Sequence, residues 1–593
     1  MPKLQIVPTM LPNKGIIIDK PEEMLLEQYS PYSRNMEFYN ELIQGRLGLS
    51  KFDLAQLNGR IMLIDQYWHF NYSWWLMVAT TKDIYAYDFS NKRFDILTPI
   101  YNTGTIEIHV GDPKVVHGSG GMLWLTNLKA GDWIKIGAGN IHTGSTWYEI
   151  DTVDSDTQVT LKTNGPTTAA GAAYVARKCF TGGDTNYWNS ISFQDAILGP
   201  TWLALNGSSF VYWTGTGQVA AVTGLPTGFT SAKYIGRFKD RVMVAWTVEG
   251  GANQPMRERW SDVANCLSWQ DVDLHDFVDE DTWIMGISDF NDYHVVFKEY
   301  EAYVGRFVGD PYVFDFEKST TCVGCYAAQS IISKKDALYY FGRDLQFHKW
   351  NLLSDQSISV LLLSETKNFD PKGLEWIYGW DNVSKHQIRW FCPKSGATYN
   401  DYTLVYDYEN NILQVWEYET AQACNVMGEY LNVADLYVDD PDWGERYVDE
   451  EEGYWDDRTF LDNAAIVIYG GYDGYIRTAD STYLDDGTEY TKTFRSVKMN
   501  FGMPQWFKRL WKQEFWLEAD IAGDIDIKIR KDDDTAWSLD TKTVSLISTT
   551  KDIIKKMITW DKQAFDFQIE ITSQNHFALL GFMNYIFQKR QRK

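Results

Sequence analysis

Hydrophobic and polar residues alternate along most of the chain in short runs, and turn-forming residues separate one run from the next. Runs such as 60–65 and 241–247 are rich in Val, Ile, Met and Trp, which suit the pleated, half-buried surface of a strand. Segments with the helical spacing of apolar residues are few. The one near the start, PEEMLLEQYS at 21–30, fits either a short helix or an extended arm. The pattern predicts an all-β protein.

Five segments share one form, in which a strand, an acidic or glycine-containing turn and a second strand follow each other. They begin at Asp83, Ser208, Tyr339, Leu404 and Ile466. Each predicts the outer hairpin of a small antiparallel sheet, and apolar runs between them predict more buried strands. Because such units recur at roughly 40–50 residues over about 400 residues, the pattern favours a distorted β-propeller with four-stranded blades. A stack of β-sandwiches is the structural alternative.

Two segments depart from this rhythm. The first contains GDWIKIG, YEIDTVDSDTQVTL and AAYVA in close succession, which predicts a small β-barrel inserted in a propeller loop. Clean alternation towards the C-terminus predicts a β-sandwich. The predicted domains are an N-terminal arm with the first strands (1–50), a first part of the propeller (51–111), the inserted barrel (112–178), a second part of the propeller (179–485) with a long acidic loop (434–462), and the C-terminal β-sandwich (486–593).

The composition narrows the classes of function. The formal net charge of −25 repels a phosphate backbone, so tight nucleic-acid binding is disfavoured, although nucleic acid can slide past an acidic wall without adhering. Six cysteines in 593 residues do not make a dense disulfide framework and indicate folding in a reduced, cytosolic compartment. The N-terminus has no apolar signal-peptide core. The uncharged stretch 196–232 contains Pro200 and Pro226, so it predicts hairpins and no membrane insertion.

The chain lacks the motifs of the common catalytic and metal sites. Neither a phosphate-binding glycine loop nor a G-x-S-x-G nucleophile turn is present, and no two histidines stand at H-x-x-x-H spacing. HGSGG at 117–121 fits a structural turn in a loop at the barrel entry. Cys322 and Cys325 have no second C-x-x-C, and the acidic loop lacks calcium-loop spacing. We predict no enzyme activity, no catalytic residue, no cofactor and no metal site.

The stretch 255–283 combines three tryptophans with eight carboxylates. A glycosidase needs two carboxylates beside aromatic platforms, but a chain this rich in both offers such pairs widely. In RERWSD, alternation directs Trp260 towards a sheet interior between flanking charges, and Trp269 is expected to pack its loop onto the sheet. With Asp262, these residues are interpreted as a structural blade junction. The acids from 271 to 281 are interpreted as a solvated connection between blades.

The segment YIGRFKDRVMVAWTVEGGANQPMRERWSDVANCLSW (234–269) resembles a phrase that recurs in tail hub and nozzle proteins of bacteriophages, especially short-tailed phages. The family comprises tail tubular protein B-like and packaged-DNA stabilisation-like β-propellers. Residues 292–351 are similar to it, as are LPNKGIIID (11–19), RNMEFYNELIQGRLGLSKF (34–52) and FRSVKMNFGMPQWFKRLWKQEFWLE (494–518). The resemblance follows the chain in order over most of its length, and the insertion departs from it.

The resemblance implies a structural virion protein, a ring commonly of six copies that lies below the portal and adaptor and conducts DNA outward. It implies a homohexamer in the virion tail, assembled in the host cytoplasm. Its partners would be the head-to-tail adaptor and the tail fibres or spikes, and viral DNA would pass transiently and non-specifically through an acidic lumen. Interface or lumen candidates are Asp439, Asp440, Asp442, Asp449, Glu450, Glu451, Glu452, Trp133 and Trp147.

Three alternatives stay open at this point. The extended LQIVPTMLPNKGIII of the N-terminal arm either adds a strand to a neighbouring subunit or completes a sheet of its own chain. A receptor- or glycan-binding tail protein is the first alternative function, and it predicts exposed Trp and Tyr in a groove. A glycan-degrading β-propeller enzyme is the second.

Overall fold

Strands dominate the computed structural model, which confirms the all-β prediction. It describes residues 4–9, 11–12, 14–39, 42–68, 74–139, 141–142, 146–279, 281–309, 312–418, 424–431, 465–518, 522–532, 534, 537, 541–546 and 553–588. The helices in this part of the chain are single turns: α1 (Trp124–Asn127), α2 (Leu363–Thr366) and the 3-10 turns η1 (Glu22–Met24), η2 (Ala328–Ser330), η3 (Val360–Leu362) and η4 (Leu374–Trp376). None of these described helices has the length and apolar character of a membrane span.

Among the described residues, seven sheets have four antiparallel strands each. In chain order of their first strands they are β6 (Ile61–Trp68), β7 (Trp74–Thr80), β8 (Ile84–Asp88), β9 (Arg93–Ile96); β18 (Asn189–Asp195), β19 (Gly199–Leu205), β20 (Phe210–Trp213), β21 (Ala220–Ala221); β22 (Phe229–Phe238), β23 (Arg241–Glu249), β24 (Ala252–Trp260), β25 (Leu274–Asp276); β26 (Ile284–Phe290), β27 (Tyr293–Lys298), β28 (Ala302–Phe307), β29 (Phe314–Lys318); β30 (Ile332–Ser333), β31 (Leu338–Phe341), β32 (Phe347–Trp350), β33 (Asp355–Ser357); β34 (Tyr378–Asn382), β35 (Gln387–Cys392), β36 (Tyr402–Asp407), β37 (Ile412–Glu417); and β38 (Cys424–Leu431), β39 (Ala465–Gly471), β40 (Ile476–Thr482), β5 (Gly48–Lys51).

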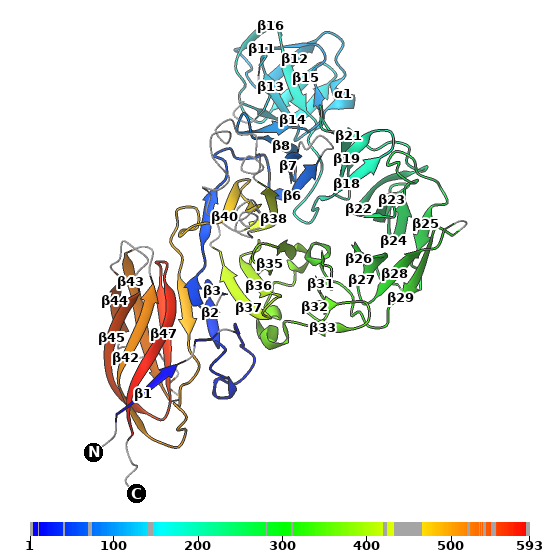
Figure 1. Ribbon diagram of the computed structural model, residues 1–593. Helices are drawn as coiled ribbons and strands as arrows, with labels where there is room; N and C mark the ends of the chain where they lie inside the picture. The colour runs from blue at the N-terminus through cyan, green and yellow to red at the C-terminus, as the bar shows by residue number, and fades with distance from the viewer. Residues whose placement is uncertain are drawn as a thin grey trace, which may run out of the picture.

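The first strands of these sheets contact one another in a closed succession. β6 contacts β18, which contacts β22, and the contacts continue through β26, β30 and β34 to β38, which returns to β6. Figure 1 shows the sheets around a common centre, from β6 through the green sheets to β38. The arrangement is consistent with a propeller-like fold, as the recurring hairpins predicted.

The ring closes with a strand from the other end of the chain. β5 pairs with β40, with Lys51 opposite Arg477 and Ser50 opposite Thr478. The prediction that every recognised hairpin is an outer one is therefore wrong for the hairpin at Ile466, which forms the second and third strands of its sheet. It is also wrong for the hairpin at Tyr339, which forms β31 and β32. These are the second and third strands of their sheet, after the two-residue β30, and the short β33 is the outer strand. Strand pairing at long range leaves no trace in local alternation.

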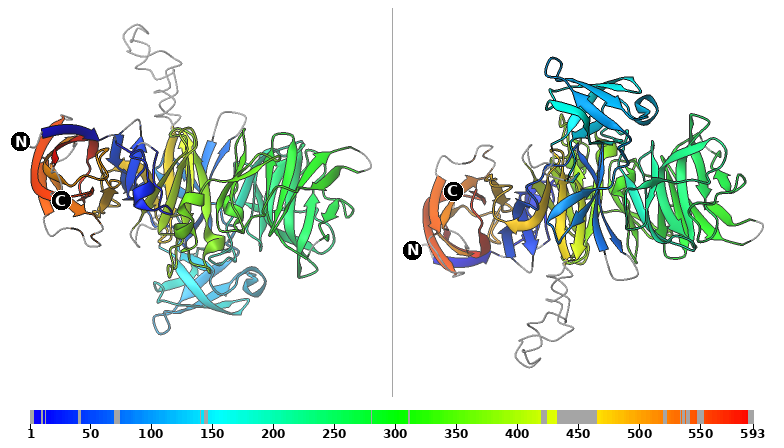
Figure 2. Two further views of the ribbon diagram at one scale, coloured as in Figure 1. Left: turned by 90° about the horizontal axis from the view of Figure 1, so that it is seen from below. Right: turned by 90° about the horizontal axis from the view of Figure 1, so that it is seen from above.

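An eight-stranded sheet is built wholly from residues 100–177. Its strands are β10 (Ile100–Tyr101), β11 (Thr105–Ile108), β12 (Val115–Ser119), β13 (Trp133–Ile136), β14 (Tyr148–Ser155), β15 (Gln158–Leu161), β16 (Thr168–Ala172) and β17 (Tyr174–Arg177). It has its own apolar core, in which Trp124 is fully buried. Figure 2 shows it projecting from one side of the ring. The turn predicted at HGSGG is wrong for 117–119, which belong to β12, where Gly118 leaves room for Met122.

Two further sheets join both ends of the chain. One contains β1 (Leu4–Thr9), β3 (Met36–Tyr39), β4 (Leu42–Gly45), β42 (Lys508–Glu518), β45 (Ile554–Ala564) and β47 (Ala578–Gln588), and the other contains β2 (Tyr32–Arg34), β41 (Lys492–Arg495), β43 (Gly523–Lys531), β44 (Thr541–Leu546) and β46 (Phe567–Ser573). β1 pairs with β47 of the same chain, with Leu4 opposite Phe587. In this structure the N-terminal strand thus completes its own sheet.

Candidate functional site

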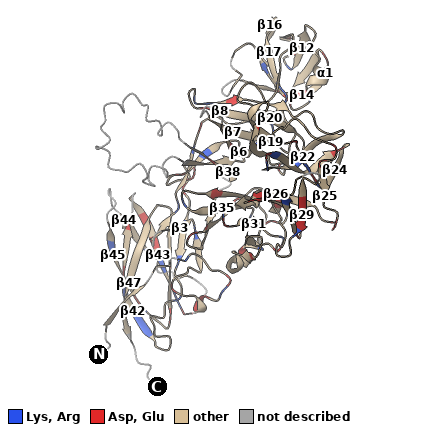
Figure 3. Ribbon diagram, turned by 45° about the vertical axis from the view of Figure 1, so that its right-hand side comes forward, with Lys and Arg blue, Asp and Glu red and all other residues tan. Residues whose placement is uncertain are grey.

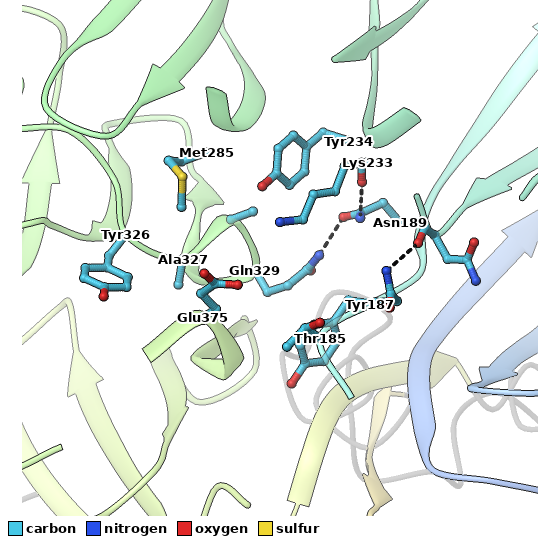
Figure 4. A pocket seen from close by; sticks show the side chains of 13 residues that line it. Thr185, Tyr187, Asn189, Lys233, Tyr234, Met285, Tyr326, Ala327, Gln329 and Glu375 are labelled. Carbon is cyan, nitrogen blue, oxygen red and sulfur yellow. Dashed lines mark hydrogen bonds between the residues drawn. The ribbon is translucent and has the colours of Figure 1, made fainter. Parts of the chain in front are cut away.

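Polar side chains surround a pocket where the first strands of several sheets converge (Figure 4). Asn189 comes from β18, Lys233 and Tyr234 from β22, Met285 from β26 and Gln329 from η2. The remaining wall is formed by Thr185, Asn186, Tyr187, Asn206, Tyr326, Ala327, Ala328 and Glu375. Because strands from different sheets supply these groups, only ring closure brings them together.

Amide side chains fix one wall of this pocket. Gln329 Nε2 donates to Asn189 Oδ1 at 2.7 Å, and Asn189 Nδ2 donates to the backbone oxygen of Lys233 at 3.0 Å. Figure 4 shows these two bonds in line between η2 and β22. The asparagine therefore holds both the glutamine and the strand that carries the lysine, so the wall is set before any ligand arrives.

A larger cavity of about 320 Å³ shares Asn189, Ala328 and Gln329 with this pocket. Tyr378, Trp380 and Asp381 of β34 form another wall, together with Ile287, Ser288, Ile331, Ile332 and Gly379. Burial raises the pKa of Asp381, while Lys334, whose Nζ lies 2.7 Å from the carboxylate, opposes the shift. Among the residues that line the two spaces there is no histidine and no cysteine. The lining suits the binding of a polar ligand.

The tryptophans predicted at an interface or lumen lie against the same arginine. The guanidinium carbon of Arg177 is 5.6 Å from the ring centroid of Trp133 and 4.3 Å from that of Trp147. Arg177 also pairs with the buried Asp83, at 3.1 Å, in the turn before β8. Both tryptophans are half-buried, and Trp147 packs against the apolar core of the ring in the same chain. Their role between subunits stays a prediction.

The acidic candidates all fall outside the described residues. They are Asp439, Asp440, Asp442, Asp449, Glu450, Glu451 and Glu452. Elsewhere, Figure 3 shows Lys and Arg interspersed with Asp and Glu over the sheets. Whether acidic residues line a lumen therefore stays a prediction.

The residues interpreted as a junction lie between neighbouring sheets. Trp260 is buried, and its ring meets that of Phe314 of β29 edge-on at 5.0 Å. Trp269 packs against Phe210 of β20 on the other side, and its Nε1 donates to the backbone oxygen of Cys266 at 2.9 Å. In the loop between β24 and β25, Asp262 accepts hydrogen bonds from Ser268 Oγ at 2.5 Å and Gln270 Nε2 at 2.9 Å.

The acids from 271 to 281 are not simply a solvated connection, so that interpretation is corrected. Leu274–Asp276 forms β25 and pairs with β24. Asp276 accepts hydrogen bonds from Nε and Nη2 of Arg257, each at 2.7 Å, so it belongs to the sheet face. The sequence pattern did not reveal β25, because the alternation of apolar and polar residues is hard to recognise over only three residues.

Two partners that sequence reasoning missed, Glu249 and His294, hold the charges of RERWSD in place. Glu249 of β23 accepts from Arg257 and Arg259, and these bonds lower the pKa of Glu249 to about 2 against the effect of burial. Glu258 is fully buried and lies 2.6 Å from His294 Nε2 of β27 in the next sheet. Only the register of β23 with β24 and the packing of two sheets reveal these partners.

The cysteines in the described residues are all free and buried. Burial raises the pKa of both Cys322 and Cys325 to about 12, which keeps these thiols protonated. No group of three His, Cys, Asp or Glu side chains placed to hold a metal ion occurs in the part of the chain that the structure describes.

Comparisons with known proteins name no family. No protein-family model and no curated protein matches the chain. Among solved structures, the chain is similar to a phage phi92 endosialidase (13% identity, 48% of this chain and 52% of that chain, TM-score 0.19) and to the Neurospora crassa Pan2 WD40 domain (7%, 74% and 95%, 0.25). It is also similar to an exo-beta-1,3-galactanase from Phanerochaete chrysosporium (9%, 67% and 100%, 0.19). The match spans about half of the endosialidase. TM-scores this low support no argument about function. The class of protein is therefore defined by the fold described above, which is all-β and propeller-like.

Proposed function

We propose that this chain is a structural protein of a bacteriophage virion, a ring-forming tail nozzle or hub that conducts DNA and docks to an adaptor and to tail fibres or spikes. In this proposal the seven four-stranded sheets form a distorted propeller and the two terminal sheets a β-sandwich. The inserted small barrel predicted at 112–178 corresponds to the eight-stranded sheet of residues 100–177, which begins earlier in the chain because it includes β10 and β11. The subunits form a homohexamer in the tail.

One observation carries the proposal: the segments that resemble the nozzle family follow the chain in order and meet at structural contacts. The phrase at 34–52 supplies β3, β4 and β5, and the phrase at 494–518 supplies β42 and part of β41. β2, directly before the first phrase, pairs with β41 through Ser33 opposite Phe494. The phrase around Trp260 supplies contacts between two sheets of the ring. The segments that resemble the family thus supply contacts between strands and between sheets, and this favours an architectural role over a catalytic one.

Electron microscopy of purified virions and of the isolated protein tests this proposal. We expect the chain in a sixfold ring at the tail, and an assembled species of six times the 68.5 kDa chain mass in solution. A protein that is absent from virions and stays monomeric at virion-like local concentration contradicts the proposal.

Two exposed aromatic residues favour receptor or glycan binding as a second candidate function. Trp283 and Tyr300 are 52% and 57% exposed, and they are neighbours because the backbone N–H of Glu299 donates to the oxygen of Trp283. Changing both to alanine is expected to reduce adsorption to host cells under this candidate, with Phe307→Ala as an exposed control in the same sheet. Unchanged adsorption opposes it. Turnover of host polysaccharide by the purified chain would instead favour the enzyme alternative.

A further inference from the structure

Lys233 has an unusual environment for a lysine inside the ring. Within the described residues, no acceptor lies within hydrogen-bonding distance of its Nζ, and no carboxylate lies within the 4.0 Å of an ion pair. The nearest charged group along the pocket wall is Glu375, which is exposed. Burial lowers the pKa of Lys233, and Glu375 opposes that shift. The ammonium group is thus partly desolvated, and among the described residues no hydrogen-bond acceptor or carboxylate lies beside it.

The fully buried lysines and arginines in the described residues all have polar partners. Each lysine or arginine that is buried in the described residues directs its charged group at a carboxylate or at backbone oxygens. They are Arg34, Arg46, Lys135, Arg177, Arg259, Lys298, Arg389, Arg477, Lys492 and Lys508. Lys233 is half-buried and has no such carboxylate or backbone oxygen beside its ammonium group among the described residues, which leaves that group available to an anion.

Aromatic rings hold the lysine stem in place. The rings of Tyr234 and Trp246 lie 5.5 and 5.4 Å from Lys233 Nζ. Trp246 reaches this position at a break in the register of β23 with β24, and its backbone is left-handed, with φ of 58°. This backbone conformation is strained for a bulky residue, and bulges that re-aim a side chain are frequent beside binding sites.

The space in front of the ammonium group matches a small ligand. Lys233 lines a small pocket of about 30 Å³. The amides of Asn189 and Gln329 border this pocket and also line the adjoining cavity of about 320 Å³. Tyr378 and Trp380 supply flat apolar surface in that cavity, and Ser288 supplies a hydroxyl. A ligand with one anionic end and an uncharged polar body fits this distribution.

We propose that the pocket at the centre of the ring binds a small organic anion, whose single carboxylate or phosphate group pairs with Lys233 while its uncharged body occupies the cavity beside Trp380. Asn189 and Gln329 orient the ligand through their amides. Glu375 at the rim disfavours ligands with a second negative group. The inference concerns the single subunit and does not depend on assembly or on a place in a virion.

Ligand-observed NMR titrations of the purified chain test the proposal with D-glucuronate, D-glucose 6-phosphate and D-glucose as probes. We expect saturable binding of at least one anion and binding of neutral glucose weaker by about tenfold or more, since a charged hydrogen bond contributes roughly 1.5–3 kcal/mol. The two anions distinguish a carboxylate from a phosphate preference. No saturable binding of either anion, or equal binding of glucose, overturns the proposal.

Matched variants locate the site. Lys233→Met keeps the stem but removes the charge, and it should weaken anion binding by about tenfold or more. Its thermal stability should not fall, because an unpaired desolvated charge is removed. Lys239→Met, at the exposed turn between β22 and β23, should leave binding unchanged. Glu375→Gln should tighten binding by about threefold. Wild-type affinity in Lys233→Met with intact folding overturns the proposal.

Discussion

Arg46 shows at the level of one residue how a charge is accommodated in the interior. Its guanidinium forms two hydrogen bonds with the fully buried Asp485, at 2.9 and 2.6 Å, and others with Asn35 and two backbone oxygens. The rings of Tyr418 and Tyr490 lie 4.4 and 3.9 Å from its central carbon. Every N–H group therefore has an acceptor, which a buried arginine requires.

Replacing Arg46 with Met should lower the stability of the region by about 3–5 kcal/mol, because Asp485 would remain buried without its counter-charge. The urea midpoint of tryptophan fluorescence measures the loss. Arg93→Met removes a half-exposed pair with Asp95 and should cost at most about 1 kcal/mol. Equal losses of stability in the two variants would show that the buried pair contributes no more to stability than the half-exposed pair.

His294 links two sheets and makes stability depend on pH. Burial alone would lower its pKa, but Glu258 and Asp289, at 2.6 and 2.7 Å, raise the pKa to about 10. Because the folded pKa exceeds the unfolded value of about 6.5, the stabilisation is complete below pH 6.5 and is lost as the pH rises towards 10.

We expect the difference in unfolding free energy between wild type and His294→Gln to be about 2 kcal/mol at pH 6 and to shrink by pH 10. Urea titrations at several pH values measure it. Lys349→Met, which removes a part-exposed pair with Asp336, serves as the control for general effects of pH. A difference that stays constant across the range would mean that His294 is not the titrating group.

Closure of the ring depends at the element scale on β5. Gly48 begins this strand, and an added Cβ would lie 2.1 Å from the oxygen of Leu484. That oxygen accepts the backbone N–H of Leu49 at 2.9 Å. The glycine is thus required because two backbone segments approach closely here.

Gly48→Ala is expected to lower the unfolding midpoint by an amount equivalent to about 1–3 kcal/mol, because the strands must separate to admit the methyl group. Gly111→Ala is the matched control, since its Cβ would meet nothing within 4 Å. Thermal melts followed by circular dichroism compare the two. An unchanged melt of Gly48→Ala would argue that β5 does not close the seventh sheet.

At the scale of the whole molecule, the 100–177 sheet is an appendage with adjacent ends. Ile100 of β10 is the direct partner of Arg177 of β17, so the chain enters and leaves at one point. Its core is separate from that of the ring. In contrast, the terminal sheets share one core with the ring sheets β30–β33 and β34–β37, and this core includes both Trp390 and Phe515.

Replacing residues 102–175 with a two-residue Asn-Gly turn should therefore leave a folded ring, since such a turn fits an antiparallel pair. Soluble expression and a cooperative melt close to that of the full chain are the expected results. Removing 494–588 is the contrasting deletion, and it should give insoluble protein because it exposes the shared core. A misfolded product of the first deletion would mean that the insertion supports the ring.

Local alternation and turn chemistry by themselves determined the all-β class, most strands and the recurring hairpins, because the side-chain period of a strand is a property of neighbouring residues. The burial of Trp260 followed for the same reason. Tertiary structure alone decided that β5 closes the ring, that β1 pairs with β47, and that Glu249 and His294 complete the charges of RERWSD. It also decided that Lys233 lines a pocket in which, among the described residues, no hydrogen-bond acceptor lies beside its ammonium group. These contacts join residues far apart in the chain, and no local pattern encodes them.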